Sequence, residues 1–169
     1  MQCENVGLYN TTNDDNYSIT YEEMKTDNII NVSDYPTAIE IVETDVYSHS
    51  VSYCSDRHEI MFTLTNTSDY WYLFGQFQSA FKLIDNEWFR ISGNVYVQLW
   101  ADQIPSNSSI NRSLNPGVFA GLNRIPLPAG VYLFEKPLYR IICRESRSAE
   151  NWVIDSQNPI MHHLILEVE

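Results

Sequence analysis

The chain has few basic residues and no long apolar run. Ten Lys and Arg oppose twenty-two Asp and Glu among 169 residues, which gives a formal net charge of -12. A field of that sign repels nucleic-acid phosphates and anionic lipid surfaces. No window approaches the roughly 18 apolar residues that a membrane-spanning helix needs. We therefore expect neither a nucleic-acid partner nor a membrane-spanning segment.

Cysteine is also scarce, and its count of three is odd. Cys54 and Cys143 flank predicted strands and are candidates for a disulfide, with two unpaired thiols as the alternative. Cys3 is a candidate lipid-anchor residue, although Gln2 is a poor fit for the small residue usual at that place. The first five residues contain neither a basic region nor an apolar core, so they do not form a signal peptide.

Aromatic residues are plentiful. They make up 13% of the chain, including eleven Tyr and four Trp, and apolar residues make up 44%. This composition excludes intrinsic disorder and favours an aromatic-rich β architecture. A chain of this length suits one domain that buries a substantial core.

Residues 58–91 carry the clearest strand signal. Residues 60–65 alternate between apolar and polar side chains, a period of two that is typical of a half-buried strand. Small polar residues at 66–69 then favour a turn. The apolar runs 81–84 and 88–91 flank a short Asp-Asn-Glu loop, so they are predicted to form a β-hairpin.

The remaining strands follow from the same alternation. They are predicted at residues 39–43, 46–53, 95–100, 118–122, 131–142, 152–154 and 163–168. Residues 101–115 are rich in Ser and Asn and indicate a long surface loop. Eight or nine short strands without a long helix predict an antiparallel sandwich or barrel. We expect it to span residues 37–169, after a polar N-terminal extension at 1–36.

Five short motifs occur in an order that is moderately specific. They are Thr63-Leu64-Thr65-Asn66, Phe74-Gly75, Asn86-Glu87-Trp88-Phe89, Leu114-Asn115-Pro116-Gly117 and Leu127-Pro128-Ala129-Gly130-Val131-Tyr132. This order resembles the bacterial immunoglobulin-like domains of secreted and cell-surface proteins, over about residues 39–169. The resemblance implies an immunoglobulin-like antiparallel β-sandwich of about seven to nine strands, with no catalytic residues and no cofactor. It also implies an extracellular or cell-surface location, with a leader peptide already removed.

No group of residues marks a catalytic or metal site. His162 and His163 are adjacent on a predicted strand, so their rings point to opposite faces and do not share a metal easily. There is no Gly-x-Ser-x-Gly motif, and nothing marks a carboxylate pair. We therefore expect a non-enzyme. Two alternatives stay open, a hydrolase that uses carboxylates and a lipocalin-like carrier of an apolar ligand.

The aromatic strand at residues 70–74 gives the best binding hypothesis. Tyr70, Trp71, Tyr72 and Phe74 lie on both of its faces, so an uncovered face would expose aromatic rings. Such rings stack on sugars or anchor protein partners. The alternative is that both faces are buried. The expected function is a non-catalytic, exported module that binds a protein or glycan, or that has a structural or adhesive role.

Overall fold

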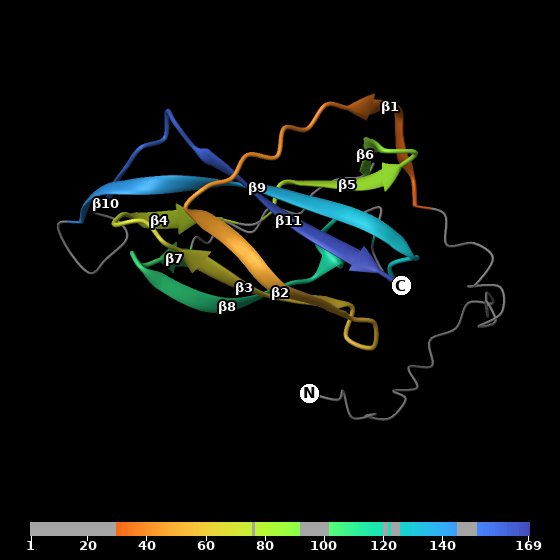
Figure 1. The fold of residues 1–169 in the computed structure, drawn as a ribbon, viewed down its shortest axis with the longest axis horizontal. Coiled ribbons are helices and arrows are strands. Elements are labelled where there is room, and N and C mark those ends of the chain that lie inside the picture. The colour runs from red at the N-terminus through yellow and green to blue at the C-terminus, as the bar shows by residue number, and fades with distance from the viewer. Residues whose placement is uncertain (1–29, 76, 92–101, 120–121, 123–125, 145–151) are drawn as a thin grey trace, which may run out of the picture.

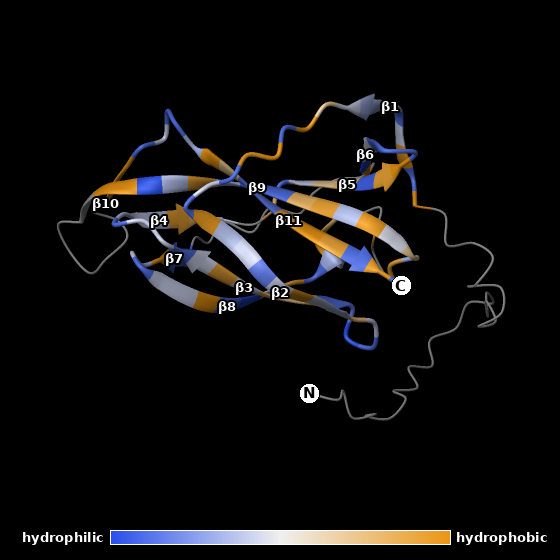
Figure 2. Cartoon of the chain, in the orientation of Figure 1, coloured by the Kyte–Doolittle hydropathy of each residue, from blue (hydrophilic) through white to orange (hydrophobic). Residues whose placement is uncertain are grey.

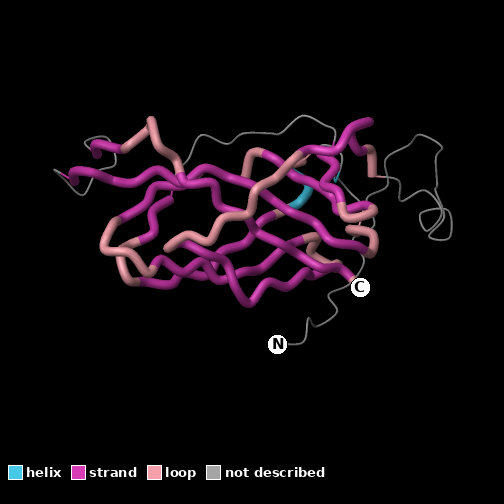
Figure 3. The backbone as a smooth tube through the Cα atoms, turned by 45° about the horizontal axis from the view of Figure 1, so that its top comes forward, coloured by secondary structure: helices cyan, strands magenta, loops and turns pink. Residues whose placement is uncertain are grey.

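A computed structural model describes residues 30–75, 77–91, 102–119, 122, 126–144 and 152–169. These residues form two antiparallel sheets that pack together as an all-β sandwich, which confirms the predicted fold class (Figure 1). Strands make up most of the described chain, and η1 (Pro116–Val118) is a short helical turn (Figure 3). The strands are β1 (Val32–Thr37), β2 (Val46–Cys54), β3 (Glu59–Asn66), β4 (Trp71–Phe74), β5 (Ser79–Ile84), β6 (Glu87–Ile91), β7 (Asp102–Ile104), β8 (Ser108–Leu114), β9 (Gly130–Arg144), β10 (Trp152–Ile154) and β11 (Ile160–Val168).

The larger sheet has eight strands and is built around β9. One edge of β9 pairs with β5 and then with β4, and its other edge pairs with β11 and then with β10. β6 and β1 extend the sheet beyond β5, while β7 extends it beyond β4. The smaller sheet has the order β2-β3-β8 and covers one face of the larger one. β9 is therefore the strand on which the larger sheet is assembled.

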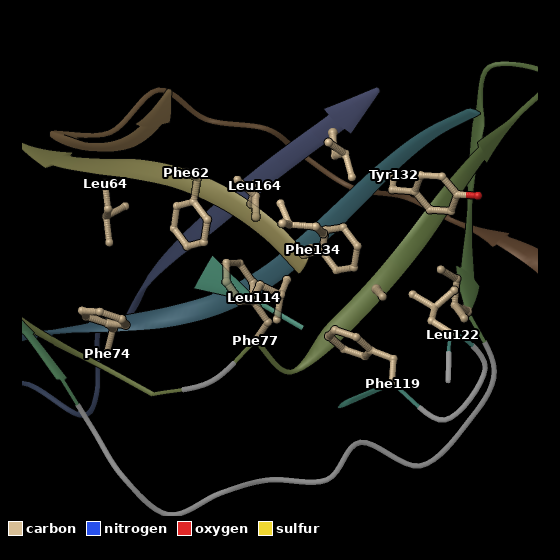
Figure 4. Close-up of a cluster of buried hydrophobic side chains, with 14 of the residues drawn as sticks. Phe62, Leu64, Phe74, Phe77, Leu114, Phe119, Leu122, Tyr132, Phe134 and Leu164 are labelled. Atoms are coloured by element: carbon tan, nitrogen blue, oxygen red, sulfur yellow. The ribbon is translucent and has the colours of Figure 1, made fainter. Parts of the chain in front are cut away.

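The two sheets bury an aromatic core between them. Alternate residues of β9 face the smaller sheet, and its bands of hydropathy alternate along the strand (Figure 2). Tyr132, Phe134 and Leu138 have no exposed surface, and burying such a side chain contributes about 1.5–3 kcal/mol. Phe62 and Leu64 of β3 point toward them from the opposite sheet (Figure 4). The alternating apolar side chains of β3 and β9 thus form the core between the two sheets.

Phe77 links the two sheets at the centre of this core. Its ring meets that of Phe62 edge-on, with centroids 6.0 Å apart, and that of Phe134 in the same way at 6.3 Å. Edge-to-face pairs at this separation contribute about 0.5–1.5 kcal/mol beyond the area they bury. Phe77 lies between the end of β4 at Phe74 and the start of β5 at Ser79. This connection therefore supplies a central core residue.

A corner held by tyrosine hydroxyls precedes β9. The buried Tyr132 hydroxyl donates to the Pro128 carbonyl at 2.7 Å, and burial raises its pKa to about 12. The Tyr53 hydroxyl accepts from the Leu127 amide at 2.9 Å and lies 2.8 Å from Nδ1 of His58. These bonds fasten the end of the β2–β3 hairpin to the segment that enters β9.

The predicted strand at residues 39–43 is wrong. Residues 38–45 connect β1 to β2 and cross from one sheet to the other, so they have no partner strand. Ile41 and Val42 are 50% and 58% exposed. The strand next to β6 is instead β1, which starts at Val32 and therefore crosses the domain boundary predicted at residue 36. Pro36 is tolerated there because β1 lies at a sheet edge.

The long loop predicted at residues 101–115 is also wrong, because it contains β7 and β8. Alternate residues of β8 are polar and exposed, while Ile110 and Leu114 pack against the core. In the predicted strand at residues 118–122, Val118 ends η1 and Phe119 makes an isolated bridge, while residues 120 and 121 lie outside the described residues. The strand predicted at 95–100 lies outside the described residues.

β2 contains a bulge that its sequence does not reveal. Ser50 has a φ of 52°, and the register with β3 shifts between His49 and Ser52. Val46 faces the core before the bulge, whereas Val51 and Tyr53 pack against it afterwards. The uninterrupted alternation predicted for residues 46–53 is therefore wrong.

The Tyr132 corner predicts a stability effect. Tyr132→Phe removes one buried hydroxyl and leaves the Pro128 carbonyl without this donor. We expect a loss of about 1–2 kcal/mol in the free energy of unfolding, measured by urea denaturation. Tyr35→Phe, at a tyrosine that is 80% exposed, is the matched control and should change little. Equal unfolding midpoints for the two variants would contradict the role of the corner.

Candidate functional site

The predicted aromatic site is only partly at the surface. Tyr72 and Phe74 are 3% and 6% exposed and belong to the core. The prediction that these two residues contact a partner is therefore wrong, because their side chains are buried. Tyr70 is 45% exposed, and Trp71 is half-buried. The strand alternates as expected, but of the four predicted aromatic residues only Tyr70 and Trp71 remain within reach of a partner.

Tyr70 is held in place by two neighbours. The guanidinium carbon of Arg140 lies 3.4 Å from the centroid of its ring, which is a close cation–π contact. The Tyr70 carbonyl accepts a hydrogen bond of 2.7 Å from the side-chain amide of Asn66. A fixed aromatic ring beside a guanidinium loses little conformational entropy on binding, which suits a protein contact.

The core contains a lysine that sequence reasoning did not single out. Lys136 is 1% exposed, and its ammonium nitrogen lies 3.8 Å from the ring centroid of Phe74 and 4.5 Å from that of Phe77. Burial, followed by the positive charge of Arg112, lowers the pKa of Lys136 to about 7, against the attraction of Asp102. Its place among the inward residues of an alternating strand was the signal in the sequence.

His162 of β11 is the register partner of Lys136 and is also buried. The two residues form a polar cluster in the core. The Nε2 atom of His162 lies 2.9 Å from the Ser48 hydroxyl of β2. Burial and then the charge of Lys136 lower the pKa of His162 to about 3, while a backbone hydrogen bond with Val46 opposes the shift. His163 lies on the other face, 3.2 Å from a Glu135 oxygen. The two imidazoles therefore point apart, as the sequence predicts.

A groove of about 490 Å³ opens where β2 and β11 meet. Ile41, Val42, Tyr47 and Met161 give it an apolar lining. Ser48 and His162 also line it, so their contact is placed where a small molecule can approach.

The Ser48–His162 contact has the distance of a nucleophile and its base, but not the required basicity. A general base works best when its pKa lies near the working pH. An imidazole whose pKa is about 3 has little tendency to take a proton from a serine hydroxyl at neutral pH. The pair is better suited to joining β2 to β11 across the edge of the sandwich.

The predicted disulfide joins two cysteines of the described residues, whereas Cys3, the candidate lipid-anchor residue, lies outside them. Cys54 ends β2 beside the Tyr53–Leu127 contact, near the start of β9, whereas Cys143 lies near the other end of that strand. Cys143 is thirteen residues after Gly130, and a strand of that length spans roughly 40 Å. This distance does not favour a disulfide between Cys54 and Cys143, and the disulfide stays a prediction. In the described ranges no three His, Cys, Asp or Glu side chains converge as metal ligands.

No protein-family model matches this chain, and no curated protein sequence does either. Within the described residues, no helix has the length and apolar character needed to cross a bilayer.

The two lowered pKa values predict how stability depends on pH. For Lys136, the folded chain loses its proton near pH 7 and the unfolded chain near 10.5, so stability rises with pH between these values. For His162, the corresponding values are about 3 and 6.5, so stability falls as the pH drops through that range. Urea unfolding from pH 3 to 10 measures both effects.

Lys136→Met isolates the first effect, because Met keeps an apolar stem beside Phe74 without the charge. We expect this variant to be more stable than the parent at pH 7, by roughly 1–4 kcal/mol, and the difference to shrink toward pH 10. Lys82→Met, at a half-buried lysine, is the control for loss of a lysine. A difference that stays constant from pH 7 to 10 would show that Lys136 is charged throughout.

Proposed function

We propose that this chain is a non-catalytic immunoglobulin-like module, exported or displayed at a cell surface, that binds a protein or a glycan. The observation that carries the proposal is the order of its strands. β2 and β3 form a hairpin, the chain crosses to β4 and β5 in the other sheet, and it returns to place β8 beside β3. It then crosses again, so that β9 lies between β5 and β11.

This path corresponds to that of an immunoglobulin-like sandwich, in which strands A, B and E share one sheet and C, F and G share the other. β2, β3 and β8 take the places of A, B and E, while β4–β5, β9 and β11 take those of C, F and G. β1, β6, β7 and β10 extend the larger sheet beyond this common set. The correspondence supports the proposal through topology alone.

Two side-chain features add to this support. A tyrosine near the start of strand F, bonded to the backbone a few residues upstream, is a hallmark of these sandwiches, and Tyr132 bonds to Pro128 in this way. In antibody domains a disulfide joins strands B and F beside a buried Trp of strand C. Here Phe62 lies on β3 and Phe134 on β9, the strands in the places of B and F. Phe77, from the segment between β4 and β5, contacts both rings at the centre of the sandwich.

The alternatives from the sequence have less support. A lipocalin-like carrier needs a large apolar cavity, whereas the space between these sheets is filled by buried side chains (Figure 4). The ion-paired carboxylates of the described residues, Asp102 and Glu135, face Arg112 and His163 rather than each other. The Ser48 contact relies on a very weak base.

Two experiments test the proposal together. Fractionation of the cells that produce the protein should place it outside the cytoplasm. Arrays of glycans and of cell-surface proteins, probed with the purified chain, should give specific binding. If a protein binds, Tyr70→Ala and Trp71→Ala should weaken it about tenfold or more, with Tyr35→Ala as the control. A cytoplasmic location together with blank arrays would contradict the proposal.

A further inference from the structure

The outer face of the β2-β3-β8 sheet has an unusual composition for so acidic a protein. Between the β2–β3 turn and the opposite end, its outward side chains carry hydroxyl, amide, imidazole, thioether or phenol groups but no formal charge. They are Tyr47, His49, Ser52, Met61, Thr63, Thr65, Ser109, Asn111 and Ser113. Glu59 bounds the face at the turn. We call this set the hydroxyl face.

Hydrogen bonds connect the hydroxyl face across all three strands. The His49 ring lies 3.0 Å from the Ser50 hydroxyl through Nδ1 and 3.0 Å from the Thr65 hydroxyl through Nε2. Thr65 and Ser109 hydroxyls are 2.7 Å apart, and the Thr63 hydroxyl donates to the Asn111 side chain at 3.0 Å. A hydroxyl has one donor and two acceptor sites, so these groups are oriented yet keep bonding capacity toward solvent.

A hollow of about 270 Å³ continues this face at its far end. Its lining consists entirely of Ser, Thr and Asn, namely Thr65, Asn66, Thr67, Asn107, Ser108 and Ser109. Its walls are fixed, because the Asn66 amide donates to the carbonyls of Tyr70 and Pro105 at 2.7 and 2.8 Å. Tyr47, 46% exposed, is the register partner of Thr65 and places an aromatic ring on the face next to the hollow.

The charges around the hollow select against an anion. The Asp69 carboxylate accepts a hydrogen bond of 3.0 Å from the Asn107 amide that lines it. The chain as a whole carries a formal charge of -12. An apolar partner fits no better, because it would cover the hydroxyl groups without bonding to them, which leaves buried polar groups unsatisfied.

A neutral sugar matches each of these properties. Its hydroxyls both donate and accept, as the Thr, Ser and Asn side chains do, and its C–H face packs on an aromatic ring such as Tyr47. We propose that the hydroxyl face and its hollow bind a neutral oligosaccharide. This rests on the proposed binding function and names the ligand class. The hollow is smaller than the roughly 300–1,000 Å³ of deep ligand pockets, so we expect weak binding.

The test is a titration of the isotope-labelled chain, followed by NMR. The probes are neutral oligosaccharides of glucose, xylose, mannose or N-acetylglucosamine and, as the acidic comparison, oligogalacturonate, each to about 20 mM. With at least one neutral probe, amide shifts should concentrate at residues 47–49, 63–67 and 107–111. Oligogalacturonate should cause no shifts there. The absence of shifts at these residues with every neutral probe would overturn the proposal.

Variants separate this site from the exposed aromatic pair. Tyr47→Ala and Thr65→Val should weaken binding of the neutral probe about tenfold, while Thr65→Ser, which keeps the hydroxyl, should stay within about twofold. Urea unfolding of each variant verifies its fold. If Tyr70→Ala weakens binding and Tyr47→Ala does not, the glycan-binding function stands but the hydroxyl face does not. If only protein arrays give binding, the module likewise stands and this site falls.

Discussion

The structure depends on one constraint, which concerns β9. This strand must find hydrogen-bonding partners along both of its edges and must bury its apolar side chains. Its backbone pairs with β5 and β4 along one edge and with β11 and β10 along the other. Its inward residues pack against β3, and the hydroxyl of Tyr132 holds the corner that precedes it. Because β9 pairs with four other strands of the larger sheet, we expect that sheet to form when β9 is in register.

The same strand also carries an energetic cost. Lys136 occupies an inward position that an apolar residue would fill without penalty. Rings of Phe74 and Phe77 face its ammonium group, and a desolvated cation–π contact contributes about 2 kcal/mol toward this cost. A polar cluster in an aromatic core restricts how β9 can pack, because a register shift would place Lys136 away from these rings.

The sequence predicted those parts of the fold in which local pattern and tertiary partner agree. The β5–β6 hairpin is one, and Asp85 and Asn86 both adopt positive φ at its turn, as a tight hairpin requires. β3, β9 and β11 are others. Residues 39–43 alternate equally well but have no partner, and β8 is polar enough to resemble a loop. The strand order decides whether an alternating segment has a partner strand. A short stretch of sequence does not reveal that order.

The candidate sites were predictable to a smaller extent. The aromatic strand was visible, but its inward face belongs to the core, since Tyr72 and Phe74 meet the opposite sheet. The hydroxyl face brings together β2, β3 and β8, and Thr65 and Ser109 are 44 residues apart. No spacing rule joins such residues before the strand order is known. The bulge at Ser50 hid the contribution of β2 in the same way.

Native-state hydrogen exchange tests the central role of β9 most directly. If the sandwich depends on this strand, the amides of residues 132–135, which lie between β5 and β11, should exchange only through global unfolding. Their exchange free energies should then equal the unfolding free energy measured with urea. Amides of β9 that exchange through local opening, while those of β3 require global unfolding, would contradict the account.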